Sequence, residues 1–216
     1  TRCSMILVFD LDGTLLDTFS LIEETYKEVL DTLVPDFVYD DALIKSFFGP
    51  PLEDSFRKVT SDKVFQQELI KFYKERNVVN HYKYLKIFPK VKEGLEKLKT
   101  KGYKMAVFSN KAHEMIMLGL KLKEIDQYFE IVLGLEDVVN PKPNPEGFEK
   151  IKAFYKEDRL VMIGDTKFDM VVAKNANVPS IGVTWALTTK KELIEFGADY
   201  VIDDFDEIFK ILEELC

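Results

Sequence analysis

The sequence has few cysteines, glycines and prolines for its 216 residues, and each shortage narrows the kind of protein it encodes. Only two cysteines occur, Cys3 and Cys216, and neither has a cysteine or histidine neighbour at metal-binding spacing. The pattern therefore indicates neither a disulfide framework nor a zinc site, and we expect free thiols. With 10 glycines and 8 prolines, the composition is typical of a globular chain with a packed core rather than a disordered or fibrous one.

Positive charge and long apolar runs are also scarce. The 30 lysines and arginines are outnumbered by 38 aspartates and glutamates, which gives a formal net charge of −8. This balance disfavours nucleic acid and anionic membranes as partners. No stretch reaches the roughly 20 apolar residues of a membrane span, and the apolar run at 5–9 is too short for the core of a signal peptide. We therefore expect a cytoplasmic protein that binds neither nucleic acid nor membrane.

What the sequence does contain is a set of short apolar runs without polar alternation. They lie at 6–9, 105–108, 131–133 and 160–163, and two further strand-like segments follow at 180–183 and 199–202. Unbroken apolar runs of this length are typical of strands buried on both faces, as in a parallel sheet covered by helices. Because segments with helical spacing separate them, the pattern predicts an α/β fold with a doubly wound, Rossmann-like parallel sheet.

The segment 17–85 breaks this alternation. It lacks a comparable strand run and shows helical spacing, as in Leu21, Thr25 and Val29. The sequence therefore predicts a small all-helical domain at 17–85, inserted after the first strand of an α/β core formed by 1–16 and 86–216. Its aromatic residues are expected to form the core of the insertion: Phe47, Phe48, Phe56, Phe65, Phe72 and Tyr73.

Reactive side chains follow the predicted strands at the points where the strands end. In chain order they are Asp10, Asp12, Ser109, Asn110, Lys142, Asp165 and Asp169. Open parallel sheets bind ligands at the carboxyl ends of their strands, near the place where the strand order reverses. We therefore expect these side chains to meet at one edge of the sheet.

The two carboxylates after the first strand suit phosphoryl transfer, which needs an in-line nucleophile and an acid for the leaving group. Asp10 emerges directly from the strand and can attack phosphorus to form an aspartyl-phosphate intermediate. Asp12, two residues further along an extended chain, points the same way. It can protonate the leaving oxygen and later activate water.

The remaining residues can hold the phosphate. Ser109 can donate its hydroxyl and Asn110 its side-chain amide, while the turn at Gly13 exposes backbone amides that favour an anion. Lys142 lies between two prolines that restrict the backbone, so it supplies a fixed positive charge toward the phosphate and the nucleophile.

Carboxylates in the same set can bind a metal ion. Asp10 and Asp165 offer the hard oxygen ligands that Mg²⁺ prefers, and Mg²⁺ usually retains several waters and the substrate phosphate as well. Asp169 lies one helical turn beyond Asp165 and can hold a metal-bound water or support the ligands. The predicted cofactor is therefore Mg²⁺.

These residues fall into four ordered motifs that resemble those of the haloacid dehalogenase-like hydrolase superfamily. The motifs are the run at 10–18, Ser109-Asn110, Pro141-Lys142-Pro143, and Gly164-Asp165 with Asp169. The resemblance implies the roles given above, and it adds that Asp12 binds the metal through its backbone carbonyl. It also implies that the helical insertion is a cap domain with a loop facing the active site. Gly49, Pro50 and Arg57 are thereby expected to contact the leaving group.

The closest subgroup by appearance is the phosphoglycolate phosphatase-like one, so a small phosphorylated metabolite is the expected substrate. Asp12 argues against a dehalogenase, which needs no acid to protonate a halide. Two alternatives stay open: an inorganic pyrophosphatase, whose capped subgroup the segments 49–54 and 119–122 also resemble, and a β-phosphoglucomutase-like enzyme. A non-enzymatic binding module would predict decayed motifs, and none has decayed. We expect a monomer or a homodimer.

Overall fold

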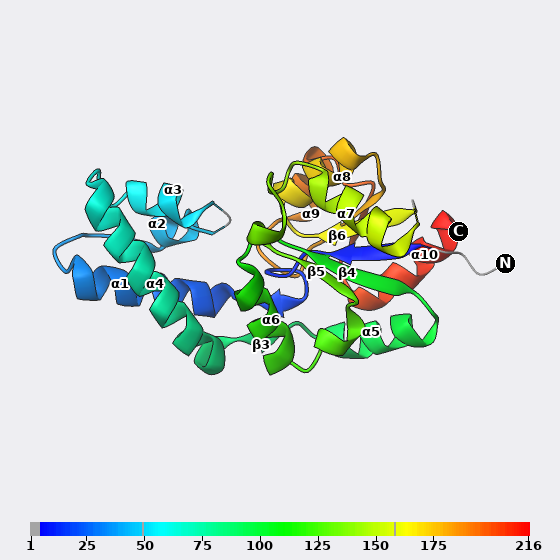
Figure 1. The fold of residues 1–216 in the computed structure, drawn as a ribbon, viewed down its shortest axis with the longest axis horizontal. Coiled ribbons are helices and arrows are strands. Elements are labelled where there is room, and N and C mark those ends of the chain that lie inside the picture. The colour runs from blue at the N-terminus through cyan, green and yellow to red at the C-terminus, as the bar shows by residue number, and fades with distance from the viewer. Residues whose placement is uncertain (1–4, 49, 158) are drawn as a thin grey trace. The chain divides into compact units, whose positions relative to one another are not determined.

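The computed structural model describes residues 5–48, 50–157 and 159–216, and Figure 1 shows its helices and strands. The chain divides into two compact units. The larger unit contains the described residues up to Asp17 together with Lys86–Cys216, and the smaller unit is Thr18–Leu85. The larger unit is an α/β structure and the smaller one is helical.

A six-stranded parallel sheet forms the centre of the larger unit, with the strand order β5-β4-β1-β6-β7-β8. Its strands are β1 (Ile6–Phe9), β4 (Lys104–Phe108), β5 (Ile131–Leu133), β6 (Leu160–Gly164), β7 (Ser180–Val183) and β8 (Tyr200–Ile202). In β1, Leu7 lies opposite Met105 of β4 and Val161 of β6. Because β1 lies between β4 and β6, the carboxyl ends of these three strands share one edge. The predicted fold class is confirmed.

Helices cover both faces of this sheet. They are α5 (Val91–Thr100), α6 (His113–Leu122), α7 (Glu146–Tyr155), α8 (Lys167–Ala176), α9 (Lys190–Glu195) and α10 (Ile208–Leu215). Short 3₁₀ turns lie at Asp126–Tyr128, Leu135–Asp137 and Phe205–Glu207. In Figure 1, α7 and α8 lie on one side of the sheet, and α5 and α10 lie on the other.

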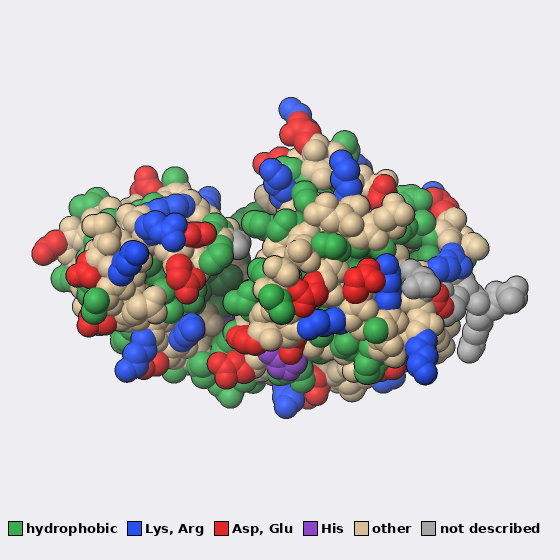
Figure 2. All heavy atoms as spheres, turned by 45° about the horizontal axis from the view of Figure 1, so that its top comes forward, with side chains coloured by type: hydrophobic (Ala, Val, Ile, Leu, Met, Phe, Trp, Pro, Cys, Tyr) green, Lys and Arg blue, Asp and Glu red, His purple; other side chains and the backbone are tan. Residues whose placement is uncertain are grey.

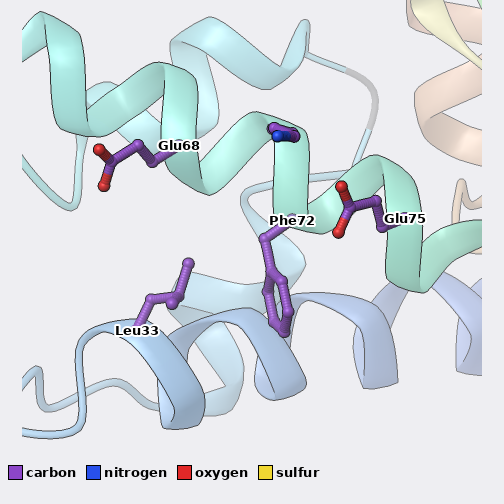
Figure 3. A pocket seen from close by; sticks show the side chains of 5 residues that line it. Leu33, Glu68, Phe72 and Glu75 are labelled. Atoms are coloured by element: carbon purple, nitrogen blue, oxygen red, sulfur yellow. The ribbon is translucent and has the colours of Figure 1, made fainter.

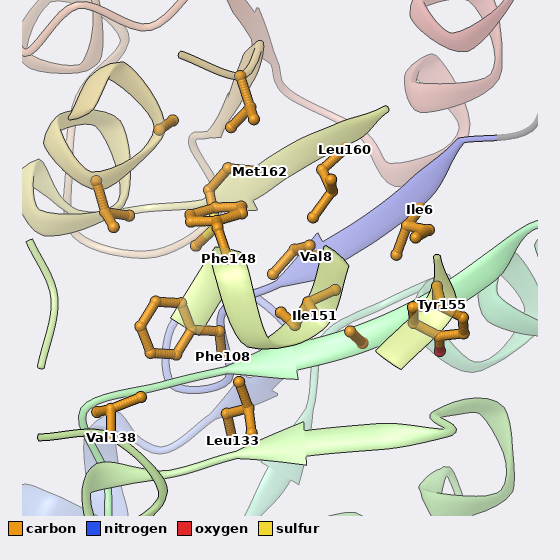
Figure 4. Close-up of a cluster of buried hydrophobic side chains, with 14 residues drawn as sticks. Ile6, Val8, Phe108, Leu133, Val138, Phe148, Ile151, Tyr155, Leu160 and Met162 are labelled. Atoms are coloured by element: carbon orange, nitrogen blue, oxygen red, sulfur yellow. The ribbon is translucent and has the colours of Figure 1, made fainter. Parts of the chain in front are cut away.

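On the side of α7 and α8, the sheet buries a continuous apolar cluster, which Figure 4 shows in close-up. Val8, Phe108 and Met162 enter it from three neighbouring strands, and Phe148 and Ile151 enter it from α7. The rings of Phe108 and Phe148 meet edge to face, with their centroids 6.0 Å apart. This close packing fixes the strands, and it therefore fixes the polar residues that follow the strand ends.

The smaller unit, within its described residues, contains α1 (Phe19–Leu33), α2 (Asp41–Lys45), α3 (Leu52–Arg57) and α4 (Lys63–Tyr84). The start of α4 is capped by Asp62, whose carboxylate accepts hydrogen bonds from the backbone N–H groups of Val64 and Phe65. A shallow pocket between α1 and α4 is shown in Figure 3. Its lining residues are Leu33, Glu68, Lys71, Phe72 and Glu75.

An aromatic cluster forms the core of the helical unit. The ring of Tyr26 contacts the rings of Phe47, Phe56 and Tyr73 at centroid distances of 4.7, 5.5 and 4.6 Å. These four side chains are buried, and the partly buried aromatics Phe48, Phe65 and Phe72 pack against them. The aromatic core predicted for this segment is confirmed.

Two details differ from the sequence pattern. The two-residue strands β2 (Leu16–Asp17) and β3 (Lys86–Ile87) pair in the antiparallel direction, and Asp17 therefore belongs to the larger unit. Strands of two residues are too short to appear as apolar runs in the sequence. The expectation of free thiols is wrong for Cys216, which is disulfide-bonded; Cys3 lies outside the described residues. Spacing along the sequence does not report which segments the fold brings near Cys216, so the pattern missed this bond.

The surface carries charges of both signs. Figure 2 shows acidic and basic side chains interspersed on the visible face of each unit. Across the part of the chain that the structure describes, every helix is too short or too polar to cross a membrane.

Candidate functional site

A buried ion triad lies at the carboxyl edge of the sheet. Lys142 Nζ donates to Asp10 Oδ1 at 2.7 Å and to Asp169 Oδ1 at 2.6 Å. The three side chains are 3%, 7% and 0% exposed, respectively. The Asp10 N–H donates to the carbonyl of Ile163 at 2.9 Å, so the sheet itself positions this carboxylate. Lys142 thus joins the end of β1 to the first turn of α8.

Asp165 adds a third carboxylate to the cluster. It follows β6 directly, is buried, and accepts a hydrogen bond from Thr14 Oγ1 at 2.9 Å. Gly13 has a φ of +83°, and a Cβ at this position would collide with the Asp165 carboxylate. Glycine is therefore required in the turn for its left-handed backbone and because the chain passes so close to Asp165.

Asp169 also serves the helix on which it lies. Its Oδ2 accepts hydrogen bonds from the N–H of Thr166 at 2.9 Å and from Thr166 Oγ1 at 2.7 Å. Thr166 and Asp169 form a capping box that begins α8. The capping contacts use one oxygen of Asp169 and hold the other, Oδ1, toward Lys142.

The side-chain amide of Asn110 holds the backbone of Lys142. Asn110 Nδ2 donates to the Lys142 carbonyl at 2.9 Å, and the Lys142 N–H donates to Asn110 Oδ1 at 2.8 Å. The sequence suggested that this amide binds phosphate, but its oxygen and one N–H are engaged with Lys142. Asn110 therefore fixes Lys142, and only the second N–H of its amide is left for another acceptor.

Ser109 and Asp12 also lie at this edge. Ser109 is buried; its N–H donates to the carbonyl of Leu133 at 3.0 Å, and its Oγ accepts a hydrogen bond from the N–H of Lys111 at 3.3 Å. Lys111 Nζ binds both carboxylate oxygens of Asp12, at 2.9 and 3.2 Å. The Asp12 side chain is 29% exposed, so it is more accessible than the other carboxylates of the cluster.

The electrostatics of the cluster reflect three buried carboxylates that share one ammonium group. Burial raises the pKa of Asp10 to about 7; Asp169 adds to the shift and Lys142 opposes it. Burial, together with Asp10 and Asp169, holds the pKa of Asp165 well above its usual range. Burial alone would lower the pKa of Lys142, but Asp10 and Asp169 raise it above its usual value. The site is thus short of positive charge.

The donor set fits a hard divalent cation. Asp10, Asp165 and Asp169 each offer a carboxylate oxygen, and these oxygens lie within 4.8 Å of one another. Oxygen-only ligands are typical of Mg²⁺, and two added positive charges would offset the burial and the repulsion that raise the pKa values of Asp10 and Asp165. The described residues therefore bring together three carboxylates that could hold a metal ion and one buried lysine.

The residues predicted in the helical insertion belong to the smaller unit. Gly49 lies outside the described residues, and Pro50 precedes α3. Arg57 ends α3, is 67% exposed, and pairs with Asp54 at 3.0 Å within the same helix. Neither Pro50 nor Arg57 lines the pocket of Figure 3.

Four residues that contact the cluster or its immediate neighbours were not predicted from the sequence to belong to the site. Thr14 and Thr166 orient Asp165 and Asp169, and their position beside a motif aspartate was the available signal. Lys111 follows Ser109-Asn110 directly and binds Asp12. Trp185, the only tryptophan, donates from Nε1 to the Thr14 carbonyl at 3.1 Å, and nothing in its sequence context indicated this contact.

Known proteins resemble this chain in both sequence and fold. The family of haloacid dehalogenase-like hydrolases matches residues 7–183. The pyrophosphatase PpaX of Listeria innocua is 33% identical over 210 residues, which are 96% of each chain, and that of Bacillus cereus is 33% identical over 212 residues, 97% of this chain and 96% of the relative. A haloacid dehalogenase-like hydrolase from Streptococcus pneumoniae superposes with a TM-score of 0.84 at 25% identity, covering 97% of this chain and 98% of the other. The chain therefore belongs to the haloacid dehalogenase-like hydrolases.

Proposed function

We propose that this phosphatase transfers the phosphoryl group of a small anionic substrate to Asp10 and then to water. The observation that carries the proposal is the buried cluster in which Lys142 bridges Asp10 and Asp169 beside Asp165. A nucleophilic carboxylate, a fixed cation and a cation-binding set of oxygens are the parts that phosphoryl transfer requires.

In the first step, an Asp10 oxygen attacks phosphorus and the bond from phosphorus to the leaving oxygen breaks. Asp12, protonated when substrate is bound, gives this proton to that oxygen, so the leaving group carries one negative charge less. In the second step, Asp12 takes a proton from water as the water oxygen attacks phosphorus. The acyl phosphate bond breaks, which releases phosphate and restores the Asp10 carboxylate.

The chain's own residues hold the phosphoryl group during both steps. Lys142 Nζ neutralises charge on Asp10 and on the transferred oxygens. Ser109 is buried at the end of β4 and can turn its hydroxyl toward a phosphoryl oxygen. The second N–H of the Asn110 amide is a further donor.

We propose Mg²⁺ as the divalent ion, held by Asp10, Asp165 and the backbone carbonyl of Asp12, with Asp169 supporting a bound water. When bound, Mg²⁺ supplies charge neutralisation for the phosphoryl oxygens. Thr14 fixes the orientation of Asp165 for this role through its 2.9 Å hydrogen bond.

Inorganic pyrophosphate is the proposed substrate, because relatives named pyrophosphatase PpaX are 33% identical over nearly the whole chain. The phosphoglycolate-like phosphomonoester expected from the motifs is the second candidate. In both cases the leaving group carries negative charge, and Lys111 places an ammonium beside Asp12, where the leaving oxygen departs in this scheme.

A substrate panel tests this proposal. Phosphate release with Mg²⁺ would be measured for pyrophosphate, phosphoglycolate and several sugar phosphates, with the Asp10→Asn variant as the blank. We expect the highest kcat/KM on pyrophosphate. Preferred hydrolysis of phosphoglycolate would establish the second candidate, and transfer of phosphate between positions of a sugar without net release would indicate a mutase.

A further inference from the structure

The loop that carries Lys142 is held by side chains from three other parts of the larger unit. Asn110, after β4, binds both backbone groups of Lys142. Asn175 on α8 donates from Nδ2 to the carbonyl of Pro143 at 2.8 Å. The beginning of the loop is held by Glu146, the first residue of α7.

Glu146 binds this part of the loop with both carboxylate oxygens. Its Oε1 accepts a hydrogen bond from the N–H of Val139 at 2.9 Å. Its Oε2 accepts from the N–H of Asn140 at 2.9 Å and from Asn140 Nδ2 at 3.2 Å. The Glu146 N–H in turn donates to Asn144 Oδ1 at 3.0 Å, so the glutamate is itself fixed.

The charge of Glu146 strengthens these contacts. Hydrogen bonds to an ionised acceptor are about twice as strong as those between neutral groups. The N–H groups of Val139 and Asn140 lower the pKa of Glu146 to about 2, so the side chain stays ionised at neutral pH. Lys150, one helical turn further, lies 3.4 Å from Oε1 and adds a positive charge behind it.

The position of this loop matters because Lys142 has little freedom. Its ammonium is 2.7 Å from Asp10 and 2.6 Å from Asp169, and the side chain is 3% exposed. Asn140 lies only two residues before it, so a shift of the backbone there moves the ammonium away from both carboxylates. A misplacement of about 1 Å can cost a factor of about 100 in rate.

We propose that Glu146 is a positioning residue for Lys142: it sets the loop so that the ammonium lies between Asp10 and Asp169. The inference rests on the proposed function for its effect on rate. Its effect on metal binding does not depend on the substrate, because Lys142 neutralises the same carboxylates that would hold the cation.

The test compares Glu146→Gln with Glu149→Gln, a matched change on the same helix, where the exposed Glu149 pairs with Lys152 at 3.1 Å. We expect Glu146→Gln to lower kcat by a factor of about 10 to 100. We also expect its Kd for Mg²⁺, measured by calorimetry, to fall, since a displaced ammonium competes less for the carboxylates. Glu149→Gln should change neither quantity.

A double-mutant cycle with Lys142→Met shows whether Glu146 acts through Lys142. Removing the ammonium should lower the Kd for Mg²⁺, and adding Glu146→Gln to Lys142→Met should change it no further. An additional, independent change in the double variant would contradict the proposal. So would a Glu146→Gln variant that loses thermal stability while keeping its kcat and its Mg²⁺ affinity.

Two outcomes need a further variant or a second measurement. If Glu146→Gln does not fold, Glu146→Asp keeps the charge and shortens the reach by one methylene, and we expect smaller shifts in the same directions. If no substrate is turned over, the proposed function fails, but the Mg²⁺ cycle still accepts or rejects the role of Glu146.

Discussion

A buried ion triad in one unit and an exposed ion pair in the other show how differently the two parts of this chain use charge. In the α/β unit, Lys142 is 3% exposed and binds Asp10 and Asp169 at 2.7 and 2.6 Å. In the helical unit, Arg57 is 67% exposed and pairs with Asp54 at 3.0 Å on its own helix. An exposed pair of this kind contributes about 0 to 1 kcal/mol, whereas removing one partner of a buried pair costs about 3 to 5 kcal/mol.

The two units differ in how their charged side chains are held in place. The buried cluster is preorganised by strand ends, a capping box and an amide clamp, which suits a phosphoryl group that is the same in every substrate. The helical unit has an aromatic core and an exposed ion pair within one helix. We infer that the larger unit determines the proposed reaction.

The largest effect is expected when the proposed nucleophile of the buried cluster is replaced. Asp10→Asn should lower kcat by a factor on the order of 10⁴ or more, because an amide cannot form the acyl phosphate. The thermal midpoint without metal should stay equal or rise, because Lys142 keeps its contact with Asp169 at 2.6 Å, so no buried charge is left unpaired, and one of the buried carboxylates is removed. Asp36→Asn, an exposed change in the helical unit, is the control and should keep full activity.

Much of the fold and of the cluster could be predicted because the relevant signals are local. Apolar runs mark the strands, and a reactive residue directly after a buried strand must lie at the edge of the sheet. This places Asp10 and Asp165 without any knowledge of side-chain conformation. The aromatic core of the helical unit followed from composition in the same way.

Partners that depend on side-chain reach could not be predicted. Asn110 looked like a phosphate donor, and only the structure shows that its amide is engaged by the Lys142 backbone 32 positions away. Trp185 reaches Thr14 across 171 positions, and no periodicity encodes such a contact. Glu146 reads in the sequence as an ordinary acidic residue in the first turn of a helix.

The next prediction concerns whether the stability of the helical unit affects Mg²⁺ binding at the buried cluster. Phe56→Ala removes a fully buried ring that contacts Tyr26 and Tyr73, and we expect it to destabilise the helical unit by about 3 to 5 kcal/mol. The Kd for Mg²⁺ should be unchanged. Chemical denaturation measures the first quantity and calorimetry the second. A matched loss of Mg²⁺ affinity would show that the two units are not separable in this sense.

A smaller effect concerns pH and metal removal. The pKa of Asp10 is raised to about 7 from an unfolded value of about 3.9, so the contribution of this group to stability is fully present below about pH 4. It is lost as the pH rises through about 7, when the buried carboxylate ionises. In EDTA the thermal midpoint should therefore fall between pH 5 and pH 8.

Mg²⁺ should restore the midpoint at pH 8, because it binds the ionised form. Asp10→Asn should flatten the decline in EDTA. The fluorescence of Trp185 provides a second readout. Trp185 donates a hydrogen bond to the Thr14 carbonyl, and the Thr14 hydroxyl donates to Asp165, so the fluorescence should change when Mg²⁺ binds. A midpoint that is constant with pH in EDTA would contradict the charge imbalance described for the cluster.

The smallest effect sharpens the contrast with the helical unit. Arg57→Ala removes an exposed charge whose pairing adds little stability, so the thermal midpoint should change by no more than about 2 °C. If Arg57 contributes to the choice of substrate, kcat/KM should change by less than about tenfold, and by different factors for pyrophosphate and phosphoglycolate. Equal factors for both substrates would remove Arg57 from the specificity residues.

The central claim is that Asp10 carries the phosphoryl group, and trapping that group tests it most directly. The enzyme would be mixed with Mg²⁺ and ³²P-labelled pyrophosphate, quenched in acid within milliseconds, and reduced with borohydride, which converts an acyl phosphate of aspartate to homoserine. We expect acid-stable label on the quenched protein before reduction, and release of that label with formation of homoserine at position 10 after reduction. Steady turnover with no labelled protein, or modification at another carboxylate, would contradict the account.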